Sequence, residues 1–345
     1  MAIPIEKFQE QGGRLKTDDI DFEAFRREPL HPDVLRCLSY MHDIEYQTVL
    51  YTRELLLMPA WNDPQFTAFL TLWNYEEYWH GQALGRVLAA HDRPAHDTRL
   101  IEMRRFNKRY LFWSPVIFWA LGHGVRKFPA VHMTWGAINE WTANAAYNRL
   151  AQIADHPVLT ELLGRIMRQE GRHAAYYASS ARDMLENDRK AQRVTKWFLE
   201  HEWAVVGSGD VPKIETSFAA AYLFGTGDGV QLIEKVEERI DALPGLSGLG
   251  LVRKGIAEAT AHVIAEEGWL PTPPSAIAAG STALRFENRL LANGDRARLQ
   301  HGRVDAADVP TLVVHHLELS ALEPCPVLKA RQRIGADLAQ DLTDA

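Results

Sequence analysis

The sequence predicts an all-α protein: a four-helix bundle with additional helices. Three observations lead to this fold class. Apolar residues recur at helical spacing for about 170 residues after Asp33. Segments that contain proline interrupt this pattern and divide it into long helical stretches. The first and third links between these stretches are short, and the second is long. This order of links predicts two helical hairpins joined by a crossover, which is one way in which four-helix bundles are connected.

The breaks define the expected elements. Residues 1–32 are polar and irregular, and we assign them to an N-terminal extension. The four bundle helices are expected over 33–58, 64–90, 129–154 and 157–186. The crossover over 91–128 is expected to contain one or two connecting helices within 98–127. Three further helices are expected over 213–225, 228–241 and 247–267, so the helical domain extends over 33–270.

The last part of the chain follows a boundary marked by Pro271, Pro273 and Pro274. Residues 275–345 form a C-terminal extension in which the periodicity is weak. We expect a helix over 284–293, a short strand over 311–314 and a helix over 326–341.

Composition argues against several classes of protein. The chain of 345 residues is 46% apolar and 24% charged, which is ordinary for a globular protein with a sizeable core. Its net charge of −7 argues against nucleic acid as the main partner. Neither cysteine lies in a CxxC motif, which argues against a thiolate metal site. The most apolar window, 111–122, has about half the length needed to span a bilayer, and no secretory signal is evident. We therefore expect a cytoplasmic protein without a transmembrane segment.

Two Glu-x-x-His motifs carry the chemistry. The first runs from Glu77 to His80 and the second from Glu170 to His173. Residues three apart lie on the same face of a helix, so each pair can present a carboxylate and an imidazole to one ion. Such a short motif is weak alone, but here each copy lies inside a predicted long helix that follows another helix.

Each of the two preceding helices carries one inward glutamate. Glu45 shares its helix face with Met41 and Val49, and Glu140 shares its face with Ala137 and Tyr147. A carboxylate on an apolar face is costly to bury unless it is paired or binds a metal. Four converging carboxylates would repel one another, and two divalent cations would remove this repulsion. Removal of one of the carboxylates is therefore expected to stabilise the metal-free protein.

The order Glu, Glu-x-x-His, Glu, Glu-x-x-His is the ligand set of ferritin-like di-iron carboxylate proteins. Oxygen donors with one imidazole per metal suit iron or manganese better than copper or zinc. The predicted fold is therefore a ferritin-like four-helix bundle with additional helices. The alternative interpretation places the glutamates on solvated helix faces and the histidines in the core, in a helical scaffold without metal.

The sequence also resembles the soluble acyl-carrier-protein desaturases over about 33–260. The segment from Trp73 to Gly81 is similar to the W-x-x-x-E-x-x-H-G motif of that family, with a doubled glutamate. The segment from Glu170 to Tyr176 is similar to the family's E-x-R-H motif and the tyrosine that follows it. The tripeptide Tyr46-Gln47-Thr48 also occurs near the first ligand of the family.

This resemblance implies roles for particular residues. Glu77 and Glu170 would bridge two iron ions, whereas the remaining ligands would each bind one ion: Glu45, His80, Glu140 and His173. Glu54 is the alternative to Glu45 as the first ligand. Thr142 would correspond to the active-site threonine of the family, although it follows Glu140 by two residues instead of three. Gln169 replaces an acidic residue that the family carries before its last glutamate ligand, and Gly171 replaces a long polar one.

The resemblance further implies an acyl-carrier-protein desaturase, which forms a double bond in a fatty acyl thioester with two iron ions and O₂. A ferredoxin-like electron donor and a homodimer are implied with it. A basic cluster, Arg104, Arg105, Lys108 and Arg109, would either dock the acidic carrier protein or form a solvated face. Two alternatives remain: a di-iron N-oxygenase or hydroxylase, and a non-enzymatic iron-binding protein. Arylamine N-oxygenases carry an extra histidine where this chain has Ile166, which counts against them.

Overall fold

The computed structural model describes residues 5–273 and 303–305. In this part of the chain almost all of the regular structure is helical, from α1 to α12, with one short 3-10 helix, η1 (Pro59–Asn62). The sheet consists of two short antiparallel strands, β1 (Trp269–Pro271) and β2 (Arg303–Asp305), with Leu270 opposite Val304. The prediction of an all-α helical bundle is confirmed.

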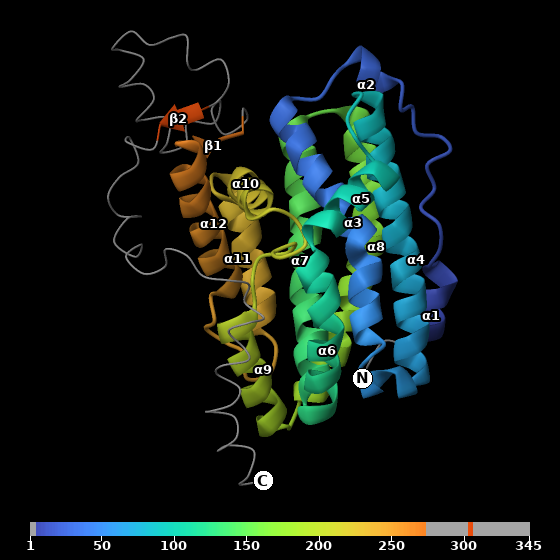
Figure 1. Cartoon of the computed structure of the whole chain (residues 1–345), viewed down its shortest axis with the longest axis vertical. Coiled ribbons are helices and arrows are strands. Elements are labelled where there is room, and N and C mark those ends of the chain that lie inside the picture. Colours follow the sequence, from blue (N-terminus) through green and yellow to red (C-terminus); the bar gives the residue numbers. More distant parts are fainter. Residues whose placement is uncertain (1–4, 274–302, 306–345) are drawn as a thin grey trace.

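Four long helices lie side by side at the centre of the molecule (Figure 1). They are α3 (Pro32–Leu55), α4 (Pro64–Ala90), α7 (Phe128–Ala154) and α8 (Pro157–Leu185). α3 packs against α4 and α7 against α8, and the two hairpins meet where α3 contacts α7 and α4 contacts α8. These four elements agree with the predicted helices to within a few residues.

Local sequence explains where the bundle helices begin. Each of α3, α4, α7 and α8 has a proline in its first turn, where the missing N–H has no helical partner to lose. The Asp63 carboxylate caps α4 by accepting hydrogen bonds from the backbone N–H groups of Gln65 and Phe66. The His156 side chain caps α8 in the same way by accepting from Leu159 N.

The crossover between the hairpins forms two helices, α5 (Asp97–Phe106) and α6 (Lys108–Gly124), as expected. Arg104, Arg105 and Lys108 are exposed here. A further layer packs on the bundle, consisting of α9 (Arg189–Glu202), α10 (Lys213–Phe224), α11 (Asp228–Asp241) and α12 (Leu251–Glu267). Three of these helices, α9, α10 and α11, contact α7. No helix was predicted over α9, although the Asp188 side chain caps it by accepting hydrogen bonds from Lys190 N and Ala191 N.

The N-terminal segment differs most from its prediction. It contains two short helices, α1 (Ile5–Gln11) and α2 (Ala24–Arg27), both of which contact α4. Leu15 and Phe25 are buried in the same core as the bundle. The segment is therefore part of the packed structure. The expected elements at 284–293, 311–314 and 326–341 lie outside the described residues.

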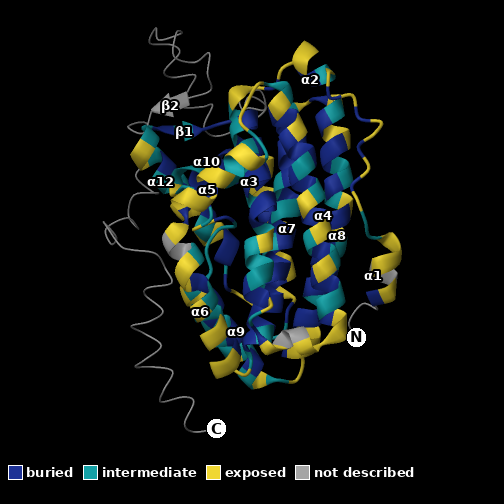
Figure 2. Cartoon of the chain, turned by 45° about the vertical axis from the view of Figure 1, so that its right-hand side comes forward, coloured by how far each residue is buried: buried dark blue, intermediate teal, exposed yellow. Residues whose placement is uncertain are grey.

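The buried residues run along the inside of the bundle (Figure 2). Most of them are apolar, but a group of glutamate and histidine side chains is buried among them. Within the described residues, no helix combines the length and the apolar character that a membrane span requires.

Candidate metal centre

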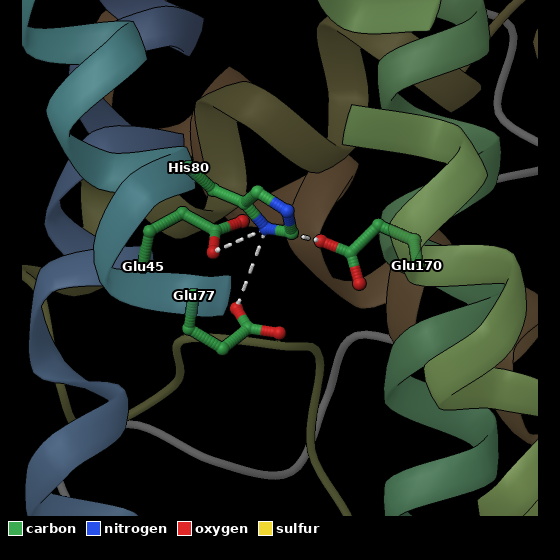
Figure 3. A group of neighbouring side chains, drawn as sticks. All are labelled: Glu45, Glu77, His80 and Glu170. Carbon is green, nitrogen blue, oxygen red and sulfur yellow. Dashed lines mark ion pairs between the residues drawn. The ribbon is translucent and has the colours of Figure 1, made fainter. Parts of the chain in front are cut away.

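Two overlapping groups of glutamate and histidine side chains lie inside the bundle. In each group, one candidate ligand atom from every residue lies within 4.8 Å of the others. The first group, drawn in Figure 3, consists of Glu45, Glu77, His80 and Glu170. The second group consists of Glu77, Glu140, Glu170 and His173. The structure thus brings together all six residues that were predicted as candidate ligands from the sequence.

All four bundle helices contribute to these groups. Glu45 lies on α3 and Glu140 on α7, whereas α4 and α8 each carry one Glu-x-x-His pair. Because residues three apart share a helix face, each pair turns its carboxylate and imidazole toward the same point. All six side chains are buried, with exposed fractions of 7% or less.

His80 faces three carboxylates through one ring nitrogen. Its Nδ1 lies 3.1 Å from Glu170 Oε1, 3.5 Å from Glu45 Oε2 and 3.9 Å from Glu77 Oε2. These side chains come from α3, α4 and α8, and in Figure 3 they point toward one another, with the dashed lines meeting at the imidazole. Three oxygen atoms and one nitrogen atom therefore surround the first candidate position.

His173 has equivalent surroundings. Its Nδ1 lies 3.0 Å from Glu77 Oε1, 3.1 Å from Glu170 Oε2 and 3.8 Å from Glu140 Oε2. Glu77 and Glu170 belong to both groups, and each turns a different oxygen toward each histidine. A carboxylate with this orientation is suited to bridge two ions. Glu45 and Glu140 each belong to one group only.

Burial and the short distances between these residues shift their pKa values. Burial alone would lower the pKa of His80, but the charges of Glu170 and Glu45 outweigh it and raise the pKa to about 10. Burial raises the pKa of Glu140 to about 8, and repulsion from Glu170 adds to this effect. Glu170 behaves oppositely. Burial would raise the pKa of Glu170, yet His80 and His173 hold it well below the ordinary value.

Several buried polar atoms at the centre make no hydrogen bond. They are Glu45 Oε2, Glu77 Oε1 and His80 Nδ1. Buried polar atoms without hydrogen bonds are unfavourable, and a metal ion among them would provide each with a partner. Carboxylate oxygens with one imidazole nitrogen per position form a donor set that suits iron or manganese. The residues present thus fit a pair of metal ions.

A second layer of residues holds the imidazoles. His80 Nε2 lies 2.8 Å from Gln169 Oε1, and His173 Nε2 lies 2.7 Å from Glu76 Oε2. Glu76 is fully buried, and its other oxygen accepts hydrogen bonds from Gly13 N, Arg172 Nη2 and Gln169 Nε2. Because both Nε2 atoms have partners here, both Nδ1 atoms are directed at the carboxylates.

The two unshared carboxylates are also held by neighbours. The Tyr147 hydroxyl donates a hydrogen bond to Glu45 Oε1. Trp73 Nε1 donates a hydrogen bond of 2.9 Å to Glu140 Oε1. Both donors are uncharged, and each leaves the other carboxylate oxygen, Oε2, directed at a histidine.

Sequence alone left the choice between Glu45 and Glu54 open, and the structure places only Glu45 in the candidate groups of the described residues. Glu54 follows it by nine residues, or about 13.5 Å along the helix axis at 1.5 Å per residue. Glu54 is buried near the end of α3, where its Oε1 lies 3.5 Å from Arg53 Nη2. The candidate catalytic residue Thr142 is buried too, and its hydroxyl donates to Ile138 O at 2.7 Å within α7.

Glu45 lies between two hollows in the protein. The larger is a groove of about 910 Å³ between α1, α3, α4 and α5, lined also by Tyr46, Leu72 and Tyr75. The smaller is a cavity of about 50 Å³ between α3, α7, α10 and α12. Its lining is mostly apolar, but it includes Glu45, Thr142 and Tyr147. The candidate centre therefore borders a space suited to an apolar group.

Comparisons of the chain with protein-family models, curated proteins and solved structures found no match. The role of Glu76 was not predicted, and its only signal in the sequence is that it doubles the glutamate of the Glu-x-x-His motif. Gln169 occupies the corresponding place before Glu170, and a comparison of these two doublets would have identified both second-layer residues.

Proposed function

We propose that the chain is a di-iron oxidoreductase that uses O₂ to desaturate a fatty acyl chain held as a carrier-protein thioester. One observation carries the proposal. Two carboxylate–imidazole groups share Glu77 and Glu170, and they border an apolar cavity that Glu45 and Thr142 line. The motif resemblance described above supports the choice of substrate and reaction.

The overall reaction removes one hydrogen from each of two adjacent CH₂ groups. The acyl chain gives up two electrons, a ferredoxin-like donor gives two more, and O₂ takes all four together with four protons to form two waters. Two of these protons come from the acyl chain and two from solvent. When bound, two iron ions supply the activation of O₂ that such unactivated C–H bonds require.

The residues of the chain have separate roles in this proposal. Glu77 and Glu170 would hold both ions, and Glu45 with His80 and Glu140 with His173 would complete one position each. The apolar cavity would exclude water and hold the reacting carbons of the acyl chain against the centre. Thr142 would lie between the bound acyl chain and Glu45, where its hydroxyl could pass a proton.

The partners follow from the same proposal. The exposed side chains of Arg104, Arg105 and Lys108 provide positive charge for an acidic carrier protein. We also propose a homodimer in the cytoplasm. A monomer in sedimentation at micromolar concentration would contradict the dimer without affecting the chemistry.

The decisive experiment combines the iron-loaded protein with a reducing system, O₂ and a panel of acyl-carrier thioesters. Mass spectrometry should find products lighter by two hydrogens, and O₂ consumption should depend on the thioester. A product heavier by one oxygen would favour a hydroxylase, and iron uptake without substrate-dependent O₂ consumption would favour an iron-binding protein. A protein that takes up no iron would contradict all three.

A further inference from the structure

The two candidate metal positions have the same kinds of inner donors. Each offers one imidazole Nδ1, the two shared carboxylates and one unshared carboxylate. Each unshared carboxylate accepts one hydrogen bond from an uncharged donor, Tyr147 for Glu45 and Trp73 for Glu140. The inner donors therefore give no reason for the two positions to differ in affinity.

The partners of the two imidazoles do differ. His173 Nε2 meets the carboxylate of Glu76 at 2.7 Å, and His80 Nε2 meets the side-chain amide of Gln169 at 2.8 Å. The three other donors to Glu76 all use Oε1, whereas His173 bonds Oε2. A charged acceptor draws the ring N–H more strongly than a neutral one, and this makes the opposite ring nitrogen a better donor to a metal.

The N-terminal segment fixes the orientation of the Gln169 amide. Gln169 Nε2 donates to Gly13 O at 2.8 Å and to Glu76 Oε1 at 3.1 Å. A carbonyl can only accept, so the amino end of the amide must face Gly13 and the oxygen must face His80. His80 therefore keeps its Nε2 proton when a metal displaces the proton from Nδ1. Both imidazoles would thus direct an Nδ1 lone pair at a bound metal, and only the charge of the second-layer acceptor separates them.

We propose that the two metal positions are unequal: the ion beside His173 binds more tightly than the ion beside His80, and the Glu76/Gln169 pair sets the difference. The inference rests on the proposed metal centre but not on the proposed reaction. Changes to such outer partners alter metal affinity by about 10- to 100-fold. A difference of about tenfold or more between the two positions is therefore expected.

The test is a titration of the metal-free protein with Co²⁺, followed by visible absorption and calorimetry. The wild-type protein should bind two ions in two separate steps. Glu140→Ala removes a ligand of the His173 position and should abolish the tight step. Glu45→Ala removes a ligand of the His80 position and should abolish the weak step. These two variants assign the steps without altering the second layer.

Glu76→Gln then tests the cause. It removes the charged acceptor of His173, so the tight step should weaken about tenfold or more, toward the affinity of the weak step. Glu161→Gln, on the exposed side of α8, is the matched control and should leave both steps unchanged. Circular dichroism establishes that each variant is folded.

Three results would overturn the inference: two equal steps in the wild-type protein, loss of the tight step in Glu45→Ala instead of Glu140→Ala, or an unchanged tight step in folded Glu76→Gln. If Glu76→Gln does not fold, the wild-type titration and the two assignment variants still decide whether the His173 position is the tighter. A wild-type protein that binds no metal would overturn the metal centre itself. If the wild-type protein binds two metal ions in unequal steps but does not desaturate acyl thioesters, the proposed reaction is wrong and this inference still holds.

Discussion

Tyr46 packs its ring so closely against Gly81 that a methyl group on Gly81 would overlap ring atom Cδ2 and lie 2.9 Å from Cε2. The ring cannot easily yield, because its hydroxyl lies 3.1 Å from His96 Nδ1 and accepts a hydrogen bond from Gln82. Gly81 directly follows His80, and Tyr46 directly follows Glu45. The packing of Tyr46 against Gly81 therefore helps to position the candidate ligands Glu45 and His80.

We predict that Gly81→Ala destabilises the protein by about 1–3 kcal/mol, as overpacking of a core usually does. It should also weaken metal binding beside His80. Gly171→Ala is the matched control, because Gly171 directly follows Glu170 and a methyl group added there would meet no neighbouring side chain within 4 Å. In a helix interior this change should stabilise by about 0.5–1 kcal/mol. Chemical unfolding of both variants measures the contrast, and equal effects would contradict the packing argument.

Glu170→Ala should reduce the bound iron below two per chain and abolish oxygen-dependent activity, because it removes a carboxylate shared by both groups. The effect on the metal-free protein is informative as well. Sequence reasoning suggested a gain in stability from relieved repulsion, but Glu170 lies 3.1 Å from the Nδ1 atoms of both His80 and His173. Its removal takes from both buried imidazoles one of the two carboxylates that they share, so we expect a loss of about 3–5 kcal/mol in the free energy of unfolding.

Glu161→Ala provides the comparison on the same helix. Glu161 is exposed and pairs with Arg165 at 2.8 Å, and such surface pairs contribute about 0–1 kcal/mol. Iron content and thermal melts with and without metal distinguish the two variants. Two irons and full turnover in Glu170→Ala would refute the ligand assignment.

The metal-free protein should lose stability as the pH rises from about 6.5 to 10. The folded state raises the pKa of His80 from 6.5 to about 10, so its contribution is complete below pH 6.5 and is lost as the pH rises through 10. The folded state also raises the pKa of Glu140 from 4.5 to about 8, so this group lowers the stability of the folded state as the pH rises from about 4.5 to 8. The two effects have the same sign.

Thermal melts of the metal-free protein across this pH range test the prediction. Metal binding displaces the same protons, so metal affinity should rise over the range in which metal-free stability falls. A melting temperature that rises with pH in the absence of metal would show that the buried groups do not titrate in this way.

Deletion of residues 1–14 should accelerate the release of metal to a chelator by about tenfold or more, the usual scale for outer partners of metal ligands. The deletion removes Gly13, which donates to Glu76 and accepts from Gln169 through its backbone. Arg14→Ala is the control: it removes the contact of Arg14 with the Trp79 ring but keeps the backbone bonds of Gly13. Equal release rates for the deletion and the intact chain would exclude this role.

Much of the bundle was predictable because its sequence signals are local. Proline in the first turn, polar caps and helical spacing of apolar residues identify α3, α4, α7 and α8 directly. Four of the six candidate ligands were predictable for the same reason, since each Glu-x-x-His pair lies within one helix turn, and Glu140 was predictable from its place on an apolar helix face. The choice between Glu45 and Glu54 was not, because both lie on one face of α3 and only packing against α4 and α8 selects between them.

The second layer was missed for a different reason. Glu76 is fully buried. The Glu-x-x-His motif needs only Glu77, however, so nothing in the sequence distinguishes Glu76 from a solvent-exposed glutamate. Its partners Gly13 and Arg172 are far from it in the sequence, and only the fold brings them together. The sequence of the N-terminal segment gives no helical pattern, because its polar residues outnumber the few, such as Leu15, that enter the core.

The backbone of Gly13 is 63 residues from Glu76 and 156 residues from Gln169 in the sequence. These two bonds can therefore form only in a fixed order during synthesis of the chain. While the ribosome is still making α8, the segment around Gly13 can bond to Glu76 on α4 but not to Gln169, and the last histidine of the centre does not yet exist. A nascent chain that ends before His173 cannot hold the complete set of candidate ligands. Complete loading of this centre with metal consequently requires a chain that has been made at least as far as His173, in the middle of the sequence, and a segment that emerges early completes its contacts only when α8 has formed.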